Sequence, residues 1–324
     1  MLISQTPMRL SLLGGNTDFA SYYLKYGGLV LTTTIDKYVY CIVKERFDDL
    51  IRVKYSIQES VERVDDLKHE LVREAMRLIG ITKGIEIAFL ADIPGEGSGL
   101  GSSSSVTVGV LNALHSYIGA PVNPMQLAEE AVKIEVDILK KPIGIQDQYI
   151  AALGGLRWIE FMKDGKVKSR RVHISNDLRR ELDNNLMLFY TGMTRSSSKI
   201  LSSLDLKGHR ELLDTNKSLA MKGIRALNTG NLEQLGKLLD TYWNLKKQLS
   251  NQISNPEINK MYGDAMEAGA LGGKIAGAGG GGFLALIVPP EKRKAVKRAL
   301  RDYKELPIGL ECDGSKIIFN IKRY

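Results

Sequence analysis

Residues 94–105 form a glycine- and serine-rich stretch, PGEGSGLGSSSS, which constrains this chain more than any other feature. An alternating apolar segment at 84–93 precedes it and predicts a strand, and apolar residues at helical spacing follow it at 106–118. Glycines let the backbone approach a ligand closely, and the unpaired N–H groups of a first helical turn favour an anion. Serine hydroxyls can bind phosphate oxygens or Mg²⁺. The stretch therefore predicts a phosphate-binding loop.

Two other interpretations of this loop are weaker. A flexible glycine–serine linker has a similar composition, but a linker would not sit tightly between a strand and an apolar helix. A Walker A loop ends in Gly-Lys-Ser/Thr, and this stretch contains no lysine. The loop is therefore expected to hold phosphate through its backbone and its hydroxyl groups.

The rest of the chain mixes strands and helices without strict alternation. Strands are expected at 1–13, 29–45, 51–56, 156–161, 166–174, 185–190, 283–288 and 315–321. Helices are expected at 64–79, 125–139, 196–206, 209–228, 231–250, 256–268 and 291–301. This order predicts an α+β fold, with helices on one face of a largely antiparallel sheet. The helix-rich second half places a domain boundary near 185–195.

Charge and cysteine content narrow the functional class. The net charge is +8, but the basic residues are scattered, and the densest run, at 291–301, has the pattern of a solvated helix face. The positive field suits small anionic substrates and argues against a nucleic-acid partner. Cys41 and Cys312 lie far apart in sequence, which predicts a reducing compartment. With no signal peptide and no apolar run of about 20 residues, we expect a cytoplasmic protein without a membrane partner.

Four further sites have two interpretations each from local sequence. Arg9, inside a predicted strand, is either an exposed edge residue or a fixed cation directed at a site. Asp18, in the turn GGNTD, either bonds its own backbone or binds substrate hydroxyls. Asp147, in GIQDQ, either caps a helix or serves a site. The four glycines at 279–282 form either a crowded turn or a place where a ligand or another backbone approaches closely.

Taken together and in order, four motifs resemble those of the GHMP kinases. These motifs are PMRLSLLGGNTDF at 7–19, the loop at 94–105, GIQDQ at 144–148 and KIAGAGGGGF at 274–283. The loop departs from the family pattern by spacing its proline and Gly-Leu-Gly more widely. The resemblance implies a two-domain fold, with an α/β domain like that of ribosomal protein S5 at 1–188 and an α+β domain at 189–324. It also implies an ATP-dependent kinase that uses Mg²⁺.

The resemblance assigns roles to individual residues. It implies Asp147 as the catalytic aspartate and Arg9 as a cation near the transferred phosphate. It implies that Mg²⁺ is bound by Ser103 and Glu135. The residues implied in binding ATP phosphates are Gly97, Gly99, Leu100, Gly101, Ser102, Ser103 and Ser104. Those expected to bind the acceptor are Asn16, Asp18, Thr194, Arg195, Gly279 and Gly280.

In finer detail the chain resembles kinases of D-glycero-D-manno-heptose 7-phosphate, which contain a segment similar to YTGMTRSSSKIL at 190–201. This resemblance implies transfer to the anomeric hydroxyl, whereas fucokinase-like domains, which act on an unphosphorylated sugar, are the close competitor. The Glu-His pair of galactokinases is replaced here by Gly15-Asn16, which argues against galactose.

The segment 191–199 suggests where an acceptor phosphate could bind. It follows a strand and opens a helix, so its N–H groups are unpaired and the dipole end is positive. An arginine fork at Arg195 beside such groups suits a phosphomonoester. The alternative is an N-capped helix with a solvated basic first turn.

Two other functional classes predict a different sequence. A non-catalytic binding protein that kept the fold would be expected to lack Asp147, Ser103 or Glu135, and all three are present. An RNA-binding protein would cluster arginines with exposed aromatic residues, and no such cluster is visible. A kinase of a small anionic substrate therefore fits the sequence better than either class.

Overall fold

The structure, a computed structural model, describes residues 1–93, 97–194, 197–202, 206 and 208–321. Its strands are β1 (Leu2–Leu13), β2 (Gly28–Glu45), β3 (Ile51–Lys54), β4 (Gln58–Val61), β5 (Ile85–Ala91), β6 (Leu156–Phe161), β7 (Val167–Arg171), β8 (Leu186–Tyr190), β9 (Gly272–Ile275), β10 (Phe283–Ile287), β11 (Glu305–Leu306), β12 (Leu310–Glu311) and β13 (Lys316–Asn320). Its α-helices are α1 (Ala20–Tyr26), α2 (Glu70–Ile79), α3 (Ser102–Tyr117), α4 (Pro124–Val132), α5 (Gln146–Leu153), α6 (Asn176–Asn185), α7 (Ser197–Ser202), α8 (Arg210–Asn228), α9 (Leu232–Lys246), α10 (Pro256–Glu267) and α11 (Arg293–Ala299). No helix within these residues has the length and apolar character that a membrane span requires.

The larger sheet is built around the long strand β2. Among the described residues it has nine strands, with the path β13-β1-β2-β5-β3-β4, and β6 and β12 also pair with β2. Its pairings are antiparallel except that of β3 with β5, which is parallel. The largely antiparallel sheet and the α+β class predicted from the sequence are therefore confirmed.

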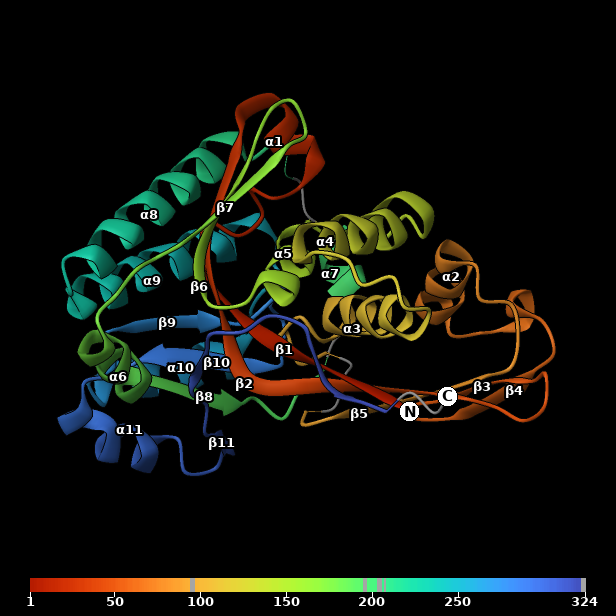
Figure 1. The fold of residues 1–324 in the computed structure, drawn as a ribbon. Helices are drawn as coiled ribbons and strands as arrows, with labels where there is room; N and C mark the ends of the chain where they lie inside the picture. The colour runs from red at the N-terminus through yellow and green to blue at the C-terminus, as the bar shows by residue number, and fades with distance from the viewer. Residues whose placement is uncertain (94–96, 195–196, 203–205, 207, 322–324) are drawn as a thin grey trace.

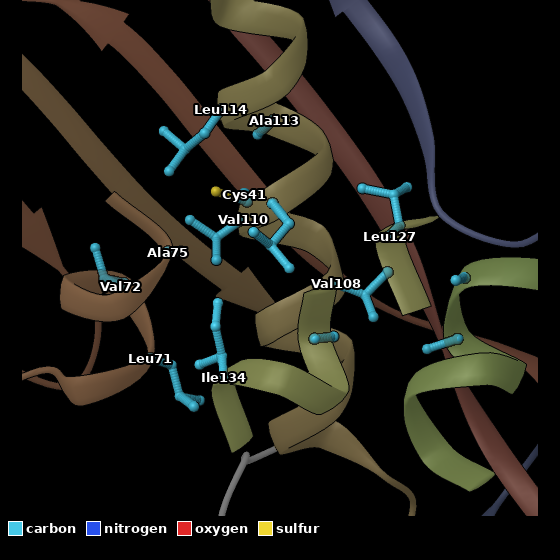
Figure 2. Close-up of a cluster of buried hydrophobic side chains, with 14 of the residues drawn as sticks. Cys41, Leu71, Val72, Ala75, Val108, Val110, Ala113, Leu114, Leu127 and Ile134 are labelled. Atoms are coloured by element: carbon cyan, nitrogen blue, oxygen red, sulfur yellow. The ribbon is translucent and has the colours of Figure 1, made fainter. Parts of the chain in front are cut away.

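One face of this sheet is covered by helices α2 to α5. Figure 2 shows the packing, with Val110 and Leu114 of the central helix α3 among the side chains of β2 and α2. Both residues are fully buried. Because α3 is buried on nearly every side, its apolar residues do not form a single stripe, and small polar residues such as Ser105 and Thr107 are buried with them. The burial fixes α3, and with it the loop that precedes its first turn.

The second sheet is formed by strands from the C-terminal part of the chain and lies beside the first sheet. Its order within the described residues is β11-β8-β10-β9, and all its pairings are antiparallel. A hydrophobic cluster joins the two sheets, with Leu10 of β1, Leu188 of β8 and Ala285 of β10 among its members. Helices α8 and α9 lie along the same side of the molecule as this sheet (Figure 1). The junction of the two sheets therefore has its own core.

The division into domains at 188/189 remains a prediction, and the sheets do not split the chain at one point. That boundary falls inside β8, all of which belongs to the smaller sheet. At the other end, β12 pairs with β2 and β13 pairs with β1, so the C-terminal strands return to the larger sheet. Sequence periodicity identifies strands but does not say which sheet each one joins.

The strand β1 changes the face that it presents along its length. Its register against β2 shifts between Pro7 and Met8. In a regular strand, residues three apart point to opposite faces. Here Thr6 contacts α3 and Arg9 contacts the loop before α3, so both lie on the helix side of the sheet. The shift in register is therefore what brings the arginine to that side.

Several expected elements are shorter or divided. The helix expected at 64–79 begins at Glu70 and is preceded by a short 3-10 turn, and the helix expected at 125–139 becomes α4 followed by a π-helical segment, Lys133–Ile138. Seven elements lie outside the ranges expected from the sequence: α1, α5, α6, β4, β9, β11 and β12. The short helix α1 and the glycine-rich β9 lack the periodicity on which such predictions depend.

The two glycine stretches pack directly against each other. Gly99, with φ near +75°, lies so close to the second stretch that a Cβ there would be 2.4 Å from the carbonyl oxygen of Ala276. A Cβ on Gly277 would be 2.7 Å from the Cα of Gly99, and one on Gly282 would be 2.5 Å from the carbonyl oxygen of Ser98. The glycines therefore permit a backbone-to-backbone contact between the loop of the first sheet and the β9–β10 turn of the second.

This contact predicts that Gly99→Ala destabilises the protein more than an equivalent change elsewhere. The control is Gly80→Ala at the end of α2, where φ is +83° and a Cβ would meet nothing within 4 Å. Gly80→Ala should cost about 1–2 kcal/mol for the left-handed backbone alone, and Gly99→Ala should cost that amount plus several kcal/mol for the overlap. Denaturant unfolding of the two variants measures the difference. Equal losses would show that the two stretches can separate freely.

Candidate active site

A cavity of about 1180 Å³ lies between the helix-covered sheet and the second sheet. Elements from both halves of the chain line it: β1, the turn after it, the start of α3, the π-helical segment, the start of α5, α9, β9 and the β9–β10 turn. Most of the residues singled out from the sequence face this one space. The lining residues among them are Arg9, Asn16, Asp18, Gly97, Gly99, Gly101, Ser102, Ser103, Ser104, Glu135, Asp147 and Thr194.

The glycine–serine loop ends at the N-terminus of α3, as the phosphate hypothesis requires. Gly97, Gly99 and Gly101 have φ values of +74°, +75° and +76°, a backbone that other residues adopt only at a cost. Gly101 is the N-cap and has no side chain to bond the first-turn N–H groups. Those groups and the helix dipole are therefore directed at the cavity and favour an anion there.

The ion pair between Arg9 and Asp147 lies at the centre of the cavity wall. Arg9 donates from Nε to Asp147 Oδ1 over 2.6 Å and from Nη2 to Oδ2 over 2.5 Å, a bidentate pair. Its remaining Nη1 donates to the carbonyl oxygen of Gly99 over 2.6 Å. Arg9 is only 5% exposed, so it is a fixed cation and not an edge residue. The N-cap of α5 is Ile145 and Asp147 lies inside the first turn, so the interpretation of Asp147 as the helix cap is wrong.

Glu135 is fully buried and faces the start of α3. The hydroxyl of Ser103 donates to Glu135 Oε2 over 3.4 Å, while Oε1 has no hydrogen-bond partner. Burial raises the pKa of the Glu135 carboxyl, and the charge of Lys141 opposes that shift. A buried carboxylate oxygen without a partner beside a hydroxyl is a donor set that fits a hard cation such as Mg²⁺. Within the described residues, no group of three or more His, Cys, Asp or Glu side chains could hold a metal.

Asp18 belongs to a buried polar group at the other end of the cavity. Its Oδ2 accepts from the backbone N–H and the side-chain amide of Gln146, at 3.2 and 3.1 Å. Asp18 Oδ1 and Asn16 Nδ2 are buried without partners. A Cβ on Gly144 would lie 2.0 Å from Asp18 Oδ2, so only glycine fits opposite this carboxylate. The unpaired atoms suit the hydroxyl groups of an acceptor better than a self-bonded turn.

The buried position of Asp18 changes the pKa of its carboxyl group. Burial foremost, and the neighbouring charge of Asp147 next, raise the pKa of Asp18 to about 6, although the bonds from Gln146 favour its ionised form. The carboxyl is therefore ionised at neutral pH only at an energetic cost to the fold. A bound ligand that donates hydrogen bonds to Oδ1 would offset that cost.

Two lysines in the cavity wall, Lys246 of α9 and Lys274 of β9, were not expected from the sequence. Both are 2% exposed. Lys274 donates to the carbonyl oxygen of Ser11 over 2.7 Å and lies 4.8 Å from the ring centre of Tyr242. Lys246 stands in no recognised motif, whereas Lys274 is the first residue of the motif KIAGAGGGGF at 274–283, which was the available signal for it.

Other expected site residues have different surroundings. Leu100 is fully buried in the core between the sheets and contributes its carbonyl oxygen, which accepts from the Arg9 N–H. Gly279 packs on the backbone of Ile253, and the N–H of Gly280 donates to the same residue, so both serve the crowded turn in this structure. Their role in acceptor binding stays a prediction. Arg195 lies outside the described residues.

Comparisons with known proteins agree with this geometry. The family model for the GHMP kinases N terminal domain matches residues 67–155, and that for the GHMP kinases C terminal domain matches residues 222–306. The chain is 33% identical over 314 residues to a D-glycero-alpha-D-manno-heptose 7-phosphate kinase of Campylobacter jejuni, with 92% of each chain covered.

Two further relatives extend the comparison. A crystal structure of a D-glycero-D-manno-heptose 1-phosphate kinase from Bacteroides thetaiotaomicron superposes with a TM-score of 0.83, at 26% identity and over 100% of both chains. The L-fucokinase/L-fucose-1-P guanylyltransferase of Bacteroides fragilis is 26% identical over 92% of this chain, which spans 36% of that protein's length. The two-domain fold is therefore that of these kinases.

The buried carboxyl of Asp18 predicts a pH-dependent stability. Because its pKa is about 6 in the folded protein and 3.8 for an unperturbed aspartate, its contribution to stability is present below pH 3.8 and is lost as pH rises through 6. Asp18→Asn should therefore raise the unfolding free energy of the ligand-free protein at pH 8, by roughly 3 kcal/mol.

Denaturant unfolding at pH 8 and pH 4 checks this expectation. The gain of Asp18→Asn over the wild type should shrink towards zero at pH 4, where both proteins carry a neutral side chain. Asp302→Asn is the control, since that side chain is 85% exposed. A gain that is absent at pH 8, or equal at both pH values, would contradict the assigned ionisation.

Proposed function

This chain belongs to the GHMP kinase family, and we propose that it transfers the γ-phosphoryl group of ATP to the anomeric hydroxyl of D-glycero-D-manno-heptose 7-phosphate. The product would be the 1,7-bisphosphate. The family uses ATP as its phosphoryl donor, and a relative covered over 92% of its length carries the name of a heptose 7-phosphate kinase. The observation that carries the proposal is the pairing of Arg9 with Asp147 beside the phosphate loop.

The phosphates of ATP are proposed to lie on the loop and the first turn of α3. The N–H groups of Ser103 and Ser104 lie in the first turn of α3, where an N–H has no carbonyl of the same helix to bond. The left-handed glycines leave no Cβ between the loop backbone and a bound phosphate. The loop therefore offers donors at fixed positions, which is most of what phosphoryl transfer needs from a protein.

Asp147 is proposed to receive the acceptor hydroxyl. The bond between the γ-phosphorus and its bridging oxygen breaks and ADP leaves with the bonding electron pair, while a bond to the sugar oxygen forms and the hydroxyl proton passes to the carboxylate of Asp147. Each carboxylate oxygen of Asp147 accepts one bond from Arg9 and keeps a lone pair for that hydroxyl. Arg9 thereby fixes the direction of the carboxylate and places positive charge beside the transferring group.

Mg²⁺ is proposed to bind to Glu135 and Ser103, whose oxygens lie together at the start of α3. When bound, the ion would neutralise charge on the phosphate oxygens. Glu135 Oε1 is buried without a hydrogen-bond partner, which supports the proposal that this carboxylate binds a cation. The π-helical segment Lys133–Ile138 positions this side chain, and such local widening of a helix often occurs at functional sites.

The acceptor is proposed to lie between Asp147 and the polar group of Asn16 and Asp18. Both of those residues have a buried polar atom without a partner, and both line the cavity. Thr194 lines the cavity and directly precedes Arg195, which we still expect to bind the non-reacting phosphate. A fucokinase-like activity on an unphosphorylated sugar is the second candidate, supported by the 26% identity to the fucokinase of Bacteroides fragilis.

A panel of sugars with Mg-ATP separates the two candidates. We expect ADP release with the heptose 7-phosphate and much slower release with L-fucose, D-galactose and the unphosphorylated heptose. Phosphorus NMR should then show a second phosphate, on the anomeric carbon. Faster turnover with an unphosphorylated sugar would place the fucokinase-like alternative ahead.

Replacing Asp147 tests the site itself. Asp147→Asn removes the charge but keeps the shape, so turnover should fall roughly 10²–10⁴-fold while ATP binding stays nearly unchanged. Turnover and the dissociation constant of ATP, measured on the same preparation, separate the two effects. Asp164→Asn, in the turn between β6 and β7, is the matched control. Near-normal turnover of Asp147→Asn would remove this residue from the mechanism.

A further inference from the structure

The two buried lysines of the cavity have no role in the mechanism described so far. A buried ammonium group is costly unless a negative charge compensates it. Lys246 donates to the carbonyl oxygen of Gly277, and Lys274 donates to that of Ser11. A carbonyl oxygen carries no net charge, so these bonds orient the two side chains without neutralising them. A bound anion would therefore stabilise the charged form of either lysine, whose pKa is lowered by burial in the empty cavity.

The two lysines lie at different parts of the cavity. Lys246 bonds Gly277, whose backbone packs on Gly99 of the phosphate loop. Lys274 lies between the backbone of β1 and the ring of Tyr242. Lys246 therefore stands where the loop, the β9–β10 turn and the cavity meet.

Arg9 is held in place by its bonds to Asp147 and to the loop. Each of its three nitrogens already donates to a protein oxygen, two to Asp147 and one to Gly99. Lys246 in its ammonium form has three N–H donors, and its described hydrogen bond uses one. It can therefore bind an oxyanion while keeping its bond to Gly277.

We infer that Lys246 binds the γ-phosphoryl group of ATP, from the side of the cavity opposite the first turn of α3. The loop would hold this group through backbone N–H groups, and Lys246 would donate a charge-assisted hydrogen bond to one of its oxygens. This inference rests on the proposed phosphoryl transfer but not on the identity of the sugar.

The electrostatic surroundings agree with this placement. The charged and titratable groups around Lys246 are Arg9 on β1, Asp18 in the turn after β1, Lys274 on β9 and Tyr242 on its own helix. Burial foremost, and then the charge of Arg9, lower the pKa of Lys246 to about 7. A nearby phosphate dianion would favour the charged form and reverse that shift.

Nucleotide affinities test the inference without any sugar. The β,γ-imido analogue of ATP carries the γ-phosphoryl group and ADP lacks it, so the ratio of their dissociation constants isolates the contacts to that group. Lys246→Met should weaken binding of the analogue about 10- to 100-fold, the range for losing a charge-assisted hydrogen bond, and leave ADP binding unchanged. Its turnover should fall about 10²–10³-fold, with little change in the KM of the acceptor.

Three further variants complete the experiment. Lys246→Arg keeps the charge and should recover part of the affinity for the analogue. Lys246→Gln can still donate to Gly277, so it carries the same test if Lys246→Met does not fold. Lys237→Met, on the exposed side of α9, should leave all constants unchanged.

If Lys246→Met weakens the binding of ADP and of the analogue by the same factor, or changes neither dissociation constant, Lys246 has a purely structural role and the inference is overturned. If the ratio changes as expected but no sugar phosphate is turned over, the proposed acceptor is wrong and the role of Lys246 stands.

Discussion

The structure depends on the contact between the loop at 97–101 and the turn at 276–282. The two backbones approach within a distance that excludes a Cβ, and this contact links the two sheets at the cavity. Arg9 and Lys246 each bond a carbonyl oxygen of one of these segments, Gly99 and Gly277 respectively. Arg9 and Lys246 are therefore positioned by two backbone segments that can approach each other only because glycines stand at the points of contact. The geometry of the site depends on this glycine packing.

The sequence predicted the parts of the fold in which one local signal dominates. The glycine–serine loop before α3 and the strands β1, β2 and β6 were expected close to their observed bounds, because apolar alternation and glycine punctuation agree there. The π-helical segment at Glu135 was not predictable, since its apolar spacing differs little from that of an α-helix. The bidentate bond between Arg9 and Asp147 joins residues 138 apart, and its geometry depends on tertiary packing that no local pattern encodes.

The chemistry of the cavity combines charges that are unfavourable in the empty protein. Asp18 and Glu135 have raised pKa values because they are buried, and Lys246 and Lys274 have lowered ones for the same reason. Each of these groups has an unused bonding capacity or a neutral partner. Such an arrangement lowers stability without ligand and is compensated when a polyanion, a cation and a polyol are bound together. The burial of these four side chains therefore favours the simultaneous binding of several ligands.

The pairing of β13 with β1 has a consequence for how the protein is made. Strand β1, which carries Arg9, is synthesised long before β12 and β13, which pair with β2 and with β1 itself. The backbone of Leu2 to Gln5 therefore lacks its β13 neighbour throughout most of translation. An unpaired strand edge of this kind can pair wrongly with other chains. The N-terminal half does not complete its own sheet, and truncation before residue 316 would expose the edge of β1 at Leu2 to Gln5.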